Sequence, residues 1–318
     1  MREKIVVITG ANSGIGKAAA TKFAKEGHKV IMACRNISTG KRVQQDIIGL
    51  TGNENVELME LDVSSFESIQ RFCNQFREKY QKLDVLINNP GYFEHGEKKY
   101  QLSSENIEIT FATNTFGPLF LIKTLLDVLS KSDDPRILNA CSTNIRHFFE
   151  PKRKIEFDNL QGEFKDSGNY NVYKMYGDSK MALLMLTFKM AEEYKDFGIK
   201  INAIQIPAIK LSKHALKKFK SVWRIAAIIE NIFAQLPETM GETYYQICTS
   251  DEFKDVTGQL INDRREIMKK SNYLQGLIPE IKQFFDITIY PKYADSQDII
   301  EKVWKFGNEL IERKTSCL

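Results

Sequence analysis

Cysteine is scarce in this sequence, and its few residues are not clustered. The 318 residues include five cysteines, at positions 34, 73, 141, 248 and 317, with no Cys-x-x-Cys or Cys/His grouping. A disulfide framework needs paired cysteines, and a zinc site needs closely spaced ligands. The pattern argues against both, so we expect no bound metal and a reducing compartment.

An excess of one charge sign is also lacking. Lysine and arginine number 45 and aspartate and glutamate 41, which leaves a formal net charge of +4 and a pI near 8.6. So small an excess does not by itself indicate a nucleic-acid partner. We therefore expect no nucleic acid among the partners.

Long apolar runs are absent too. No stretch approaches the roughly 20 apolar residues that cross a bilayer. The chain passes from Met1 to Lys4 directly into an apolar run at 5–8, which leaves no room for a signal or transit peptide ahead of the fold. We expect a cytoplasmic protein. The residues from Ser316 to Leu318 faintly resemble a peroxisomal address, which leaves peroxisomal association as an alternative to an ordinary frayed tail.

Short apolar runs alternate with amphipathic stretches over the first two thirds of the chain. Runs without polar alternation are typical of strands buried on both faces. They lie at 5–8, 30–34, 56–61, 85–87, 137–140 and 201–206. Helical patterns lie between them, at 16–26, 38–50, 65–80, 104–129 and 173–197. The third helix is preceded by a capping box of Ser64 and Glu67. This alternation predicts an α/β fold with a doubly wound parallel sheet, a Rossmann fold, whose ligands bind beyond the carboxyl ends of the strands.

The C-terminal third has a looser pattern. We expect a Lys-rich helix at 211–236, a helix at 238–249, a short strand near 259–261 and a final helix at 296–313. The predicted organisation is a Rossmann catalytic domain over 1–270 that includes a substrate lid at about 208–236. A C-terminal extension over 271–318 would follow, with its terminal helix packed on the same domain.

Three glycines follow the first expected strand. Gly10, Gly14 and Gly16 let the backbone turn tightly, approach a pyrophosphate and pack the next helix on the sheet. The free N–H groups at the start of that helix would bind phosphates. A strand-to-helix loop can need glycine for local reasons alone. The place of this loop in the first strand-turn-helix unit favours a dinucleotide site.

The second expected strand ends in Arg35 and Asn36 rather than in an acid. An acid would accept hydrogen bonds from the adenosine ribose, whereas an arginine would pair with a 2′-phosphate. We therefore expect NADP(H), with NAD(H) the less favoured cofactor and a solvated surface arginine the alternative reading. Asp62, after the third strand, is a candidate contact for the adenine amino group or a helix N-cap.

Tyr176 and Lys180 are spaced by one helical turn. A fixed positive charge lowers the pKa of a phenol from its usual value of about 10. The spacing therefore predicts a proton donor and acceptor, with an ordinary amphipathic helix face as the alternative.

These motifs, in their order along the chain, resemble those of the short-chain dehydrogenases/reductases. The resemblance covers roughly residues 4 to 262. It includes Thr9 to Gly16, Asn88-Asn89-Pro90-Gly91, Asn114, Ser142, and Tyr176 to Lys180. Within the family the sequence is similar to retinol-dehydrogenase-like and WW-domain-oxidoreductase-like members, through Ala33-Cys34-Arg35 and an insertion at 157–163.

The resemblance implies a mechanism. Tyr176 would be the general acid or base at a hydrophobic carbonyl or alcohol, while hydride passes to or from the nicotinamide. Lys180 would hold the nicotinamide ribose and lower the pKa of Tyr176, and Ser142 would hydrogen-bond the carbonyl oxygen. Asn114 would bind a water that completes a proton relay from Lys180 to solvent.

The same resemblance implies the cofactor contacts. They are Gly10, Asn12, Ser13, Gly14, Ile15, Gly16, Arg35, Asn36, Asp62, Val63, Asn89, Gly91, Tyr176, Lys180 and Pro207. The sequence departs from the family pattern at Pro90, which removes an N–H, and at Ala208, which replaces a glycine. We expect both departures to weaken cofactor affinity rather than to affect proton transfer.

The expected function is that of an NADP(H)-dependent carbonyl reductase or alcohol dehydrogenase. The alternative is a catalytically silent NADP-binding protein that senses redox state or binds a partner. The basic segment at 210–224 and the apolar residues up to 233 are expected to cover substrate, and they leave a peripheral membrane contact open. The sequence also leaves a homodimer open.

Overall fold

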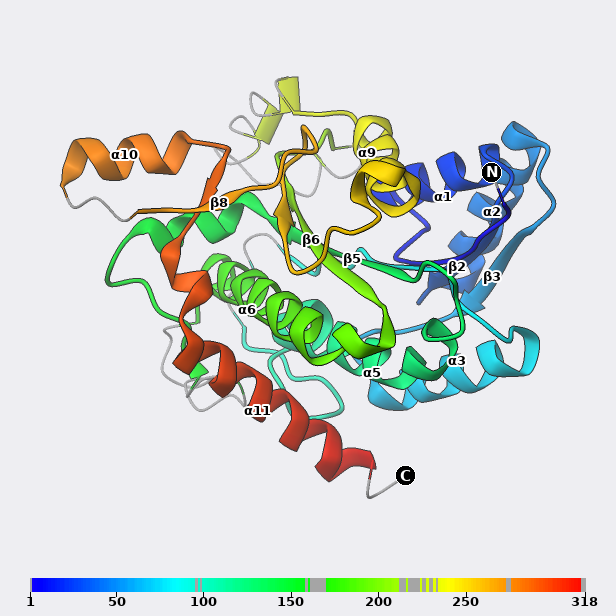
Figure 1. Ribbon diagram of the computed structural model, residues 1–318, viewed down its shortest axis with the longest axis horizontal. Helices are drawn as coiled ribbons and strands as arrows, with labels where there is room; N and C mark the ends of the chain where they lie inside the picture. The colour runs from blue at the N-terminus through cyan, green and yellow to red at the C-terminus, as the bar shows by residue number, and fades with distance from the viewer. Residues whose placement is uncertain are drawn as a thin grey trace.

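A seven-stranded parallel sheet forms the centre of the molecule (Figure 1). The computed structural model describes residues 2–94, 97, 99–157, 160, 170–211, 216, 224, 227–228, 231–232, 234–272 and 276–315. The strands are β1 (Ile5–Thr9), β2 (Lys29–Cys34), β3 (Val56–Glu60), β4 (Val85–Asn88), β5 (Arg136–Ser142), β6 (Lys200–Ile206) and β7 (Leu260–Ile261). Their order in the sheet is β3-β2-β1-β4-β5-β6-β7, and every pair is parallel. The predicted doubly wound sheet is confirmed, and the strand order reverses between β1 and β4.

Helices cover both faces of the sheet and enclose two apolar cores. The core of one face includes residues of α1 (Gly14–Lys25), α2 (Ile37–Thr51) and α9 (Pro237–Thr249). The core of the other face includes residues of α3 (Phe66–Lys79), α5 (Gly117–Leu129), α6 (Val172–Glu193) and α11 (Gln297–Thr315). Figure 1 shows these two groups of helices on opposite sides of the sheet. The apolar strand residues are therefore buried on both faces, which is why they lack the alternation of a half-exposed strand.

The long helix expected at 104–129 is divided into three parts. It begins as α4 (Ile109–Phe111), continues as a π-helix, η1 (Ala112–Phe116), and becomes α5 at Gly117. The start is later than expected because Glu108 is the N-cap, where its carboxylate accepts from Thr110 N at 2.9 Å and Phe111 N at 3.0 Å. The stretch Ile109–Leu129 is long and apolar enough to cross a membrane, but 72% of its most apolar window is buried inside the protein.

The capping box predicted at Ser64 and Glu67 is wrong by one residue. The N-cap of α3 is Ser65, whose hydroxyl accepts from Ser68 N at 3.3 Å. Ser64 instead donates both its N–H and its hydroxyl to Asp62. Two adjacent serines are equally good cap residues in sequence, and the local turn at Asp62 selects the second.

The C-terminal third contains more regular structure than the sequence predicted. The expected elements are present as α9, β7 and α11. Between them lie α10 (Leu277–Phe285) and a two-stranded parallel ribbon of β8 (Lys269–Lys270) and β9 (Ile289–Tyr290). The 3₁₀ helices in the described part of the chain are η2 (Thr143–Phe149), η4 (Lys195–Phe197), η5 (Asp251–Phe253) and η6 (Lys292–Asp295). Most of the helix expected at 211–236 lies outside the described residues.

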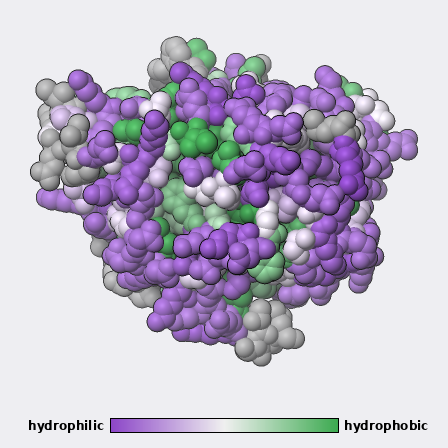
Figure 2. Space-filling view, in the orientation of Figure 1, coloured by the Kyte–Doolittle hydropathy of each residue, from purple (hydrophilic) through white to green (hydrophobic). Residues whose placement is uncertain are grey.

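A buried arginine attaches α10 to the body of the protein. Arg146, in η2, donates to the carbonyl oxygens of Phe284 at 2.6 Å and Asp286 at 2.9 Å, and also to Gln205 on β6. A cation is favourable at the C-terminal end of a helix, where carbonyl groups lack partners within the helix. Figure 2, in the orientation of Figure 1, shows apolar residues gathered toward the middle of the visible face of the molecule, with hydrophilic residues around them.

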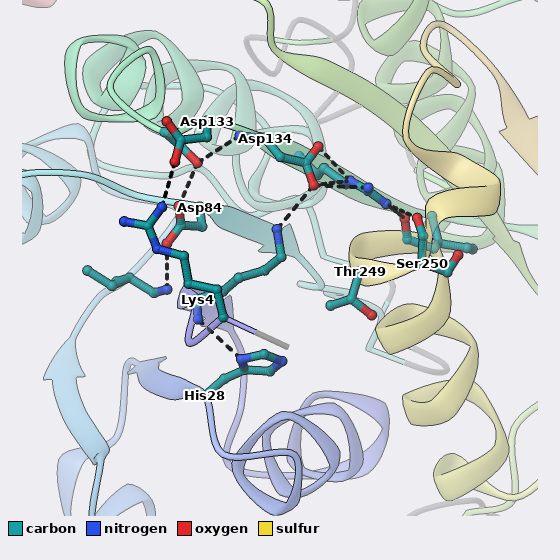
Figure 3. A network of polar contacts seen from close by, with 12 residues as sticks. Lys4, His28, Asp84, Asp133, Asp134, Thr249 and Ser250 are labelled. Carbon is teal, nitrogen blue, oxygen red and sulfur yellow. Dashed lines mark hydrogen bonds and ion pairs between the residues drawn. The ribbon is translucent and has the colours of Figure 1, made fainter.

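The amino ends of the strands are tied together by polar contacts (Figure 3). Asp84 accepts from Ile5 N at 2.8 Å, and Lys4 forms an ion pair with Asp134 at 3.1 Å. Arg136 pairs with Asp134 and donates to Ser250 O at 2.8 Å, just past the end of α9. These contacts join β1, β4, β5 and α9 at one edge of the sheet. Lys4, Asp134 and Arg136 thus form ion pairs at this edge, whereas the opposite edge carries the candidate site.

The packing of α9 on α1 depends on a glycine. A Cβ atom added at Gly241 would lie 2.7 Å from Ala18 C and 2.9 Å from Ala19 N. We expect Gly241→Ala to lower the free energy of unfolding by about 1–3 kcal/mol in urea denaturation, because backbone atoms of α1 would have to move. The matched control is Gly49→Ala in α2, where an added Cβ meets no atom within 4 Å. The control should stabilise the protein by roughly 0.5–1 kcal/mol. A Gly241→Ala variant as stable as this control would contradict the packing account.

Candidate active site

The turn between β1 and α1 has the backbone of an anion-binding loop. Gly10 and Gly14 have φ angles of +65° and +51°, which side chains other than glycine rarely adopt. A Cβ atom at Gly16 would collide with Gly10 O, so the third glycine allows α1 to pack against the turn. Ser13, the N-cap of α1, makes no side-chain cap hydrogen bond. The first N–H groups of α1 are therefore available to an anion.

Two cavities open at the carboxyl ends of the strands, and they share four lining residues of the loops after β1 and β4. The larger has a volume of about 600 Å³ and extends from the glycine turn to Ser142, Tyr176 and Lys180. The smaller, of about 240 Å³, is lined by Arg35, Asn36, Asp62 and Val63, among others. Every predicted cofactor contact except Gly16 lines one of the two. Predicted residues that lie far apart in sequence are thus brought together at the strand-order reversal.

The smaller cavity contains the residues expected to hold adenosine. Arg35 is exposed, and no side chain in the described ranges forms an ion pair with it. Asn36 has a structural task as well, because its side chain accepts from Thr39 N at 2.9 Å and caps α2. Asp62 is not a helix N-cap, since its carboxylate bonds to Ser64. The helix N-cap role considered for Asp62 is therefore wrong, and its contact with a ligand stays a prediction.

Lys180 is buried and its ammonium group is held by two main-chain carbonyls. It donates to Ala140 O, at the end of β5, at 2.8 Å and to Pro90 O, after β4, at 2.9 Å. Burial lowers the pKa of Lys180 from 10.5 to about 8, because water no longer solvates the charge. The lysine therefore joins α6 to the ends of two central strands.

The predicted effect of Lys180 on Tyr176 is not found in this structure. Burial raises the pKa of Tyr176 above its ordinary value, and a hydrogen bond with Ser142 opposes that rise. The Lys180 ammonium lies 5.9 Å from the centroid of the Tyr176 ring and bonds to carbonyls instead. The prediction of a lowered Tyr176 pKa was wrong because it considered helical spacing alone and omitted the desolvation of the phenol.

Asn114 is fully buried in the π-helix η1. Its Oδ1 accepts from Tyr92 N at 2.8 Å, and its Nδ2 donates to Tyr92 O at 3.1 Å and Ser179 Oγ at 3.1 Å. Ser179 Oγ in turn donates to Tyr176 O at 2.8 Å. Asn114 thus links the loop after β4 to Ser179 of α6, which directly precedes Lys180 and bonds to the Tyr176 carbonyl. A π-turn inside a helix is a frequent feature of functional sites.

The sequence did not predict the support behind the glycine turn. Asn89 binds Thr9 twice, through Asn89 N to Thr9 Oγ1 at 2.9 Å and through Nδ2 to Thr9 O at 3.3 Å. The hydroxyl of Tyr244, a fully buried residue of α9, donates to Asn89 Oδ1 at 3.1 Å. The helical pattern of α9 places Tyr244 on a buried face, but no sequence signal identifies Asn89 as its partner.

The two departures from the family pattern have defined surroundings. Pro90 lacks an N–H but supplies the carbonyl that accepts from Lys180. Ala208 O accepts from Gln235 N at 2.9 Å, and Gln235 Nε2 donates to Asp263 at 2.6 Å. Both residues line the larger cavity. Each therefore retains a structural role at the carboxyl edge of the sheet.

Comparison with known proteins gives matches over most of the chain. The family model described as short chain dehydrogenase matches residues 4–149. Human retinol dehydrogenase 11 is 30% identical over 260 residues, which cover 82% of this chain and 77% of that protein. Human retinol dehydrogenase 13 is 28% identical over 268 residues, 83% of this chain and 77% of that protein. The chloroplastic short-chain dehydrogenase TIC 32 A of Brassica napus is 27% identical over 312 residues, 96% of this chain and 88% of that protein.

Solved structures share the fold. A short-chain dehydrogenase of Shigella flexneri, complexed with NADP, matches with a TM-score of 0.62 at 20% identity and covers 83% of this chain and 98% of that chain. An uncharacterized protein from Mycobacterium paratuberculosis matches with a TM-score of 0.65 at 22% identity, covering 97% and 93% of the two chains. At these identities the likeness shows the fold alone.

The burial of Lys180 predicts a pH-dependent stability. Between pH 8 and 10.5 the unfolded chain keeps a proton on Lys180 that the folded chain has lost, so folded stability rises with pH in this window. Lys180→Met removes this dependence. We expect the free energy of unfolding of Lys180→Met, minus that of the unsubstituted protein, to be largest near pH 7 and to fall as the pH approaches 10.

Urea denaturation at several pH values measures this difference. Lys25→Met, at an exposed position in the last turn of α1, is the control and should show a nearly constant difference. A Lys180→Met difference that is equally constant from pH 7 to 10 would show that the buried lysine keeps the pKa of an exposed one.

Proposed function

Because the chain belongs to the short-chain dehydrogenase/reductase family of oxidoreductases, with retinol-dehydrogenase-like relatives, we propose that it interconverts hydrophobic carbonyls and alcohols with NADP(H). The observation that carries the proposal is the meeting of Tyr176, Ser142 and Lys180 in the same cavity as the glycine turn. A protein that only bound a dinucleotide would not need a half-buried tyrosine and a buried lysine at the far end of that cavity.

The residues of the two cavities fit a nicotinamide dinucleotide. The uncapped start of α1 and the open space beside Gly14 suit a pyrophosphate. Arg35 is exposed and has no anionic partner among the described side chains, so it suits a 2′-phosphate. An exposed arginine at this position supports NADP(H) over NAD(H), because only NADP(H) carries the 2′-phosphate. The NADP in the Shigella flexneri structure is consistent with a nicotinamide cofactor for this chain.

In the proposed reduction, bound NADPH would supply a hydride with its two electrons to the carbonyl carbon, and Tyr176 would donate a proton to the carbonyl oxygen. Burial raises the pKa of Tyr176, so the phenol carries its proton at neutral pH, as a proton donor must, but it is a weaker acid than an exposed phenol. Ser142 donates a hydrogen bond to the same oxygen and stabilises its developing charge. Tyr176 then regains a proton from the solvent side, through Lys180, whose pKa of about 8 allows proton exchange near neutral pH.

Asn114 has limited capacity to bind the water of a proton relay. Both N–H donors of its side chain are used, on Tyr92 O and Ser179, and Oδ1 accepts from Tyr92 N. One lone pair of Oδ1 is left to accept from a water. We propose that the relay water donates to this oxygen, and that the main task of Asn114 is to hold Tyr92 and Ser179 in place.

The proposal also includes a covering segment, a place of action and a substrate class. The segment 208–236 would cover the substrate, and the protein would act in the cytoplasm on a small hydrophobic molecule. Only a few residues of this segment fall within the described part of the chain, among them Ile228 and Ile232, which are exposed. A peripheral membrane contact through 210–233 and a homodimer stay open within this proposal.

Loss of the phenol hydroxyl should abolish turnover. We expect Tyr176→Phe to reduce NADPH oxidation by at least roughly a hundredfold, the contribution of a positioned general acid, with the Kd of NADPH unchanged. The assay follows NADPH absorbance with aliphatic, aromatic, retinoid and steroid carbonyls. Tyr194→Phe, at the other end of α6 and outside both cavities, is the control and should retain full turnover. Normal turnover by Tyr176→Phe would refute the mechanism, and NADPH binding without turnover of any carbonyl would favour the silent binding protein.

Removal of Arg35 should change cofactor preference. Arg35→Leu is expected to weaken NADPH binding by roughly tenfold while leaving NADH binding unchanged, because a charge-assisted contact with the 2′-phosphate is lost. Arg42→Leu, also exposed but outside both cavities, is the matched control. Fluorescence titration of both cofactors measures the effect. Equal loss of NADPH and NADH affinity in Arg35→Leu would contradict recognition of the phosphate.

A further inference from the structure

An aromatic side chain from outside α6 packs against the Tyr176 ring. The centroid of the Phe93 ring lies 5.1 Å from that of Tyr176, with the two planes at 53°. The Phe93 ring also meets Tyr173 edge-on, at a centroid distance of 5.2 Å. Phe93 follows Gly91 in the loop after β4, so these contacts bring the loop and α6 together. Phe93, Tyr173 and Tyr176 thus form one aromatic cluster.

Phe93 faces the larger cavity as well as the protein. It lines that cavity together with Tyr176 and Ser142, and 36% of its surface is exposed. The ring is therefore packed against Tyr173 and Tyr176 and is also partly exposed. The cavity is also lined by the aliphatic residues Ile206, Ala208, Ile209 and Leu211 of the segment that follows β6. Its lining thus combines one aromatic residue beside Tyr176 with an aliphatic set from another segment.

The position of the reacting oxygen limits where a substrate can lie. When a carbonyl oxygen accepts hydrogen bonds from both Tyr176 and Ser142, the carbonyl carbon lies one bond length away, beside the tyrosine ring. The first group attached to that carbon must then lie next to the same ring. Aromatic rings attract one another at centroid distances of 4.5–7 Å in offset or edge-to-face arrangements, and Phe93 lies within that range of Tyr176. A flat ring on the carbonyl carbon can therefore reach the exposed part of Phe93.

We propose that Phe93 is a specificity-determining residue that favours aryl carbonyls, in which an aromatic ring is bonded directly to the carbonyl carbon. This inference rests on the proposed function, since it takes Tyr176 and Ser142 as the groups that hold the oxygen. A saturated ring of the same size fills similar space but has no π face or positive ring edge to offer to Phe93. The preference comes from the shape and charge distribution of the ring rather than from its hydrophobicity.

A second role for Phe93 makes a different prediction. If the ring only supported Tyr176, its removal would slow all substrates by the same factor. A role in specificity changes the ratio between substrates instead. The ratio of kcat/KM for benzaldehyde to that for cyclohexanecarbaldehyde separates the two, because the difference in intrinsic reactivity cancels when two variants are compared.

The first measurement is this ratio in the unsubstituted protein, in Phe93→Leu and in Phe93→Tyr. We expect Phe93→Leu to lower the ratio by roughly two- to twelvefold, the range given by one aromatic contact, and Phe93→Tyr, which keeps the ring, to retain it. Phe285→Leu, at an exposed aromatic residue of α10 outside the cavity, should leave the ratio unchanged. An equal effect of Phe93→Leu on both aldehydes would overturn the proposal.

The second measurement does not depend on turnover. Benzamide and cyclohexanecarboxamide present the same carbonyl oxygen but are not reduced, and their Kd values for the NADP-loaded protein can be obtained by calorimetry. Phe93→Leu should raise the Kd of benzamide by a similar two- to twelvefold factor and leave the Kd of the saturated amide unchanged. Discrimination between the amides without turnover of any carbonyl would sustain the Phe93 site and refute the proposed function. Turnover with no discrimination in either measurement would refute the Phe93 site alone.

Discussion

The arrangement of the site depends on the burial of one lysine ammonium between two strand ends. Lys180 reaches from α6 to Ala140 O and Pro90 O, so one side chain joins the helix that carries Tyr176 to β5 and to the loop after β4. A buried ammonium group without hydrogen-bond partners would be strongly destabilising. These two carbonyls therefore stabilise the fold as well as the site. The same burial lowers the pKa of Lys180 to about 8. The burial therefore lowers folded stability at neutral pH and, in the proposed mechanism, provides a group that exchanges protons there.

The other contacts at this edge of the sheet hold the loops around that lysine. Asn114 fixes the backbone of Tyr92 to Ser179, and the Tyr244 hydroxyl fixes Asn89 against the glycine turn. The polar network at the opposite edge pairs its own charges and holds the amino ends of β1, β4 and β5 together. One edge of the sheet therefore carries a network of ion pairs and hydrogen bonds, and the other carries the cavities of the candidate site.

The sequence predicts the secondary-structure elements and the residues of the site better than it predicts the contacts among those residues. Six apolar runs coincide with β1 to β6 within one or two residues, because burial on both faces removes any need for alternation. The ordered motifs predict which residues meet at the cavities. The π-turn at Asn114, the choice of Ser65 over Ser64 and the Tyr244–Asn89 hydrogen bond depend on packing between distant elements, which periodicity does not report. The direction of the Tyr176 pKa shift was wrong for the same reason, since desolvation is a property of the folded surroundings.

The central claim is that this cavity transfers a hydride from the cofactor to a carbonyl carbon while Tyr176 protonates the oxygen. The most direct test uses NADPH with deuterium in both positions at C4 of the nicotinamide and a carbonyl substrate, with mass spectrometry of the alcohol formed. We expect an alcohol with one deuterium on the former carbonyl carbon, formed by the unsubstituted protein and not by Tyr176→Phe. Saturating NADPH binding with no deuterium in any product, or equal transfer by both proteins, would contradict it.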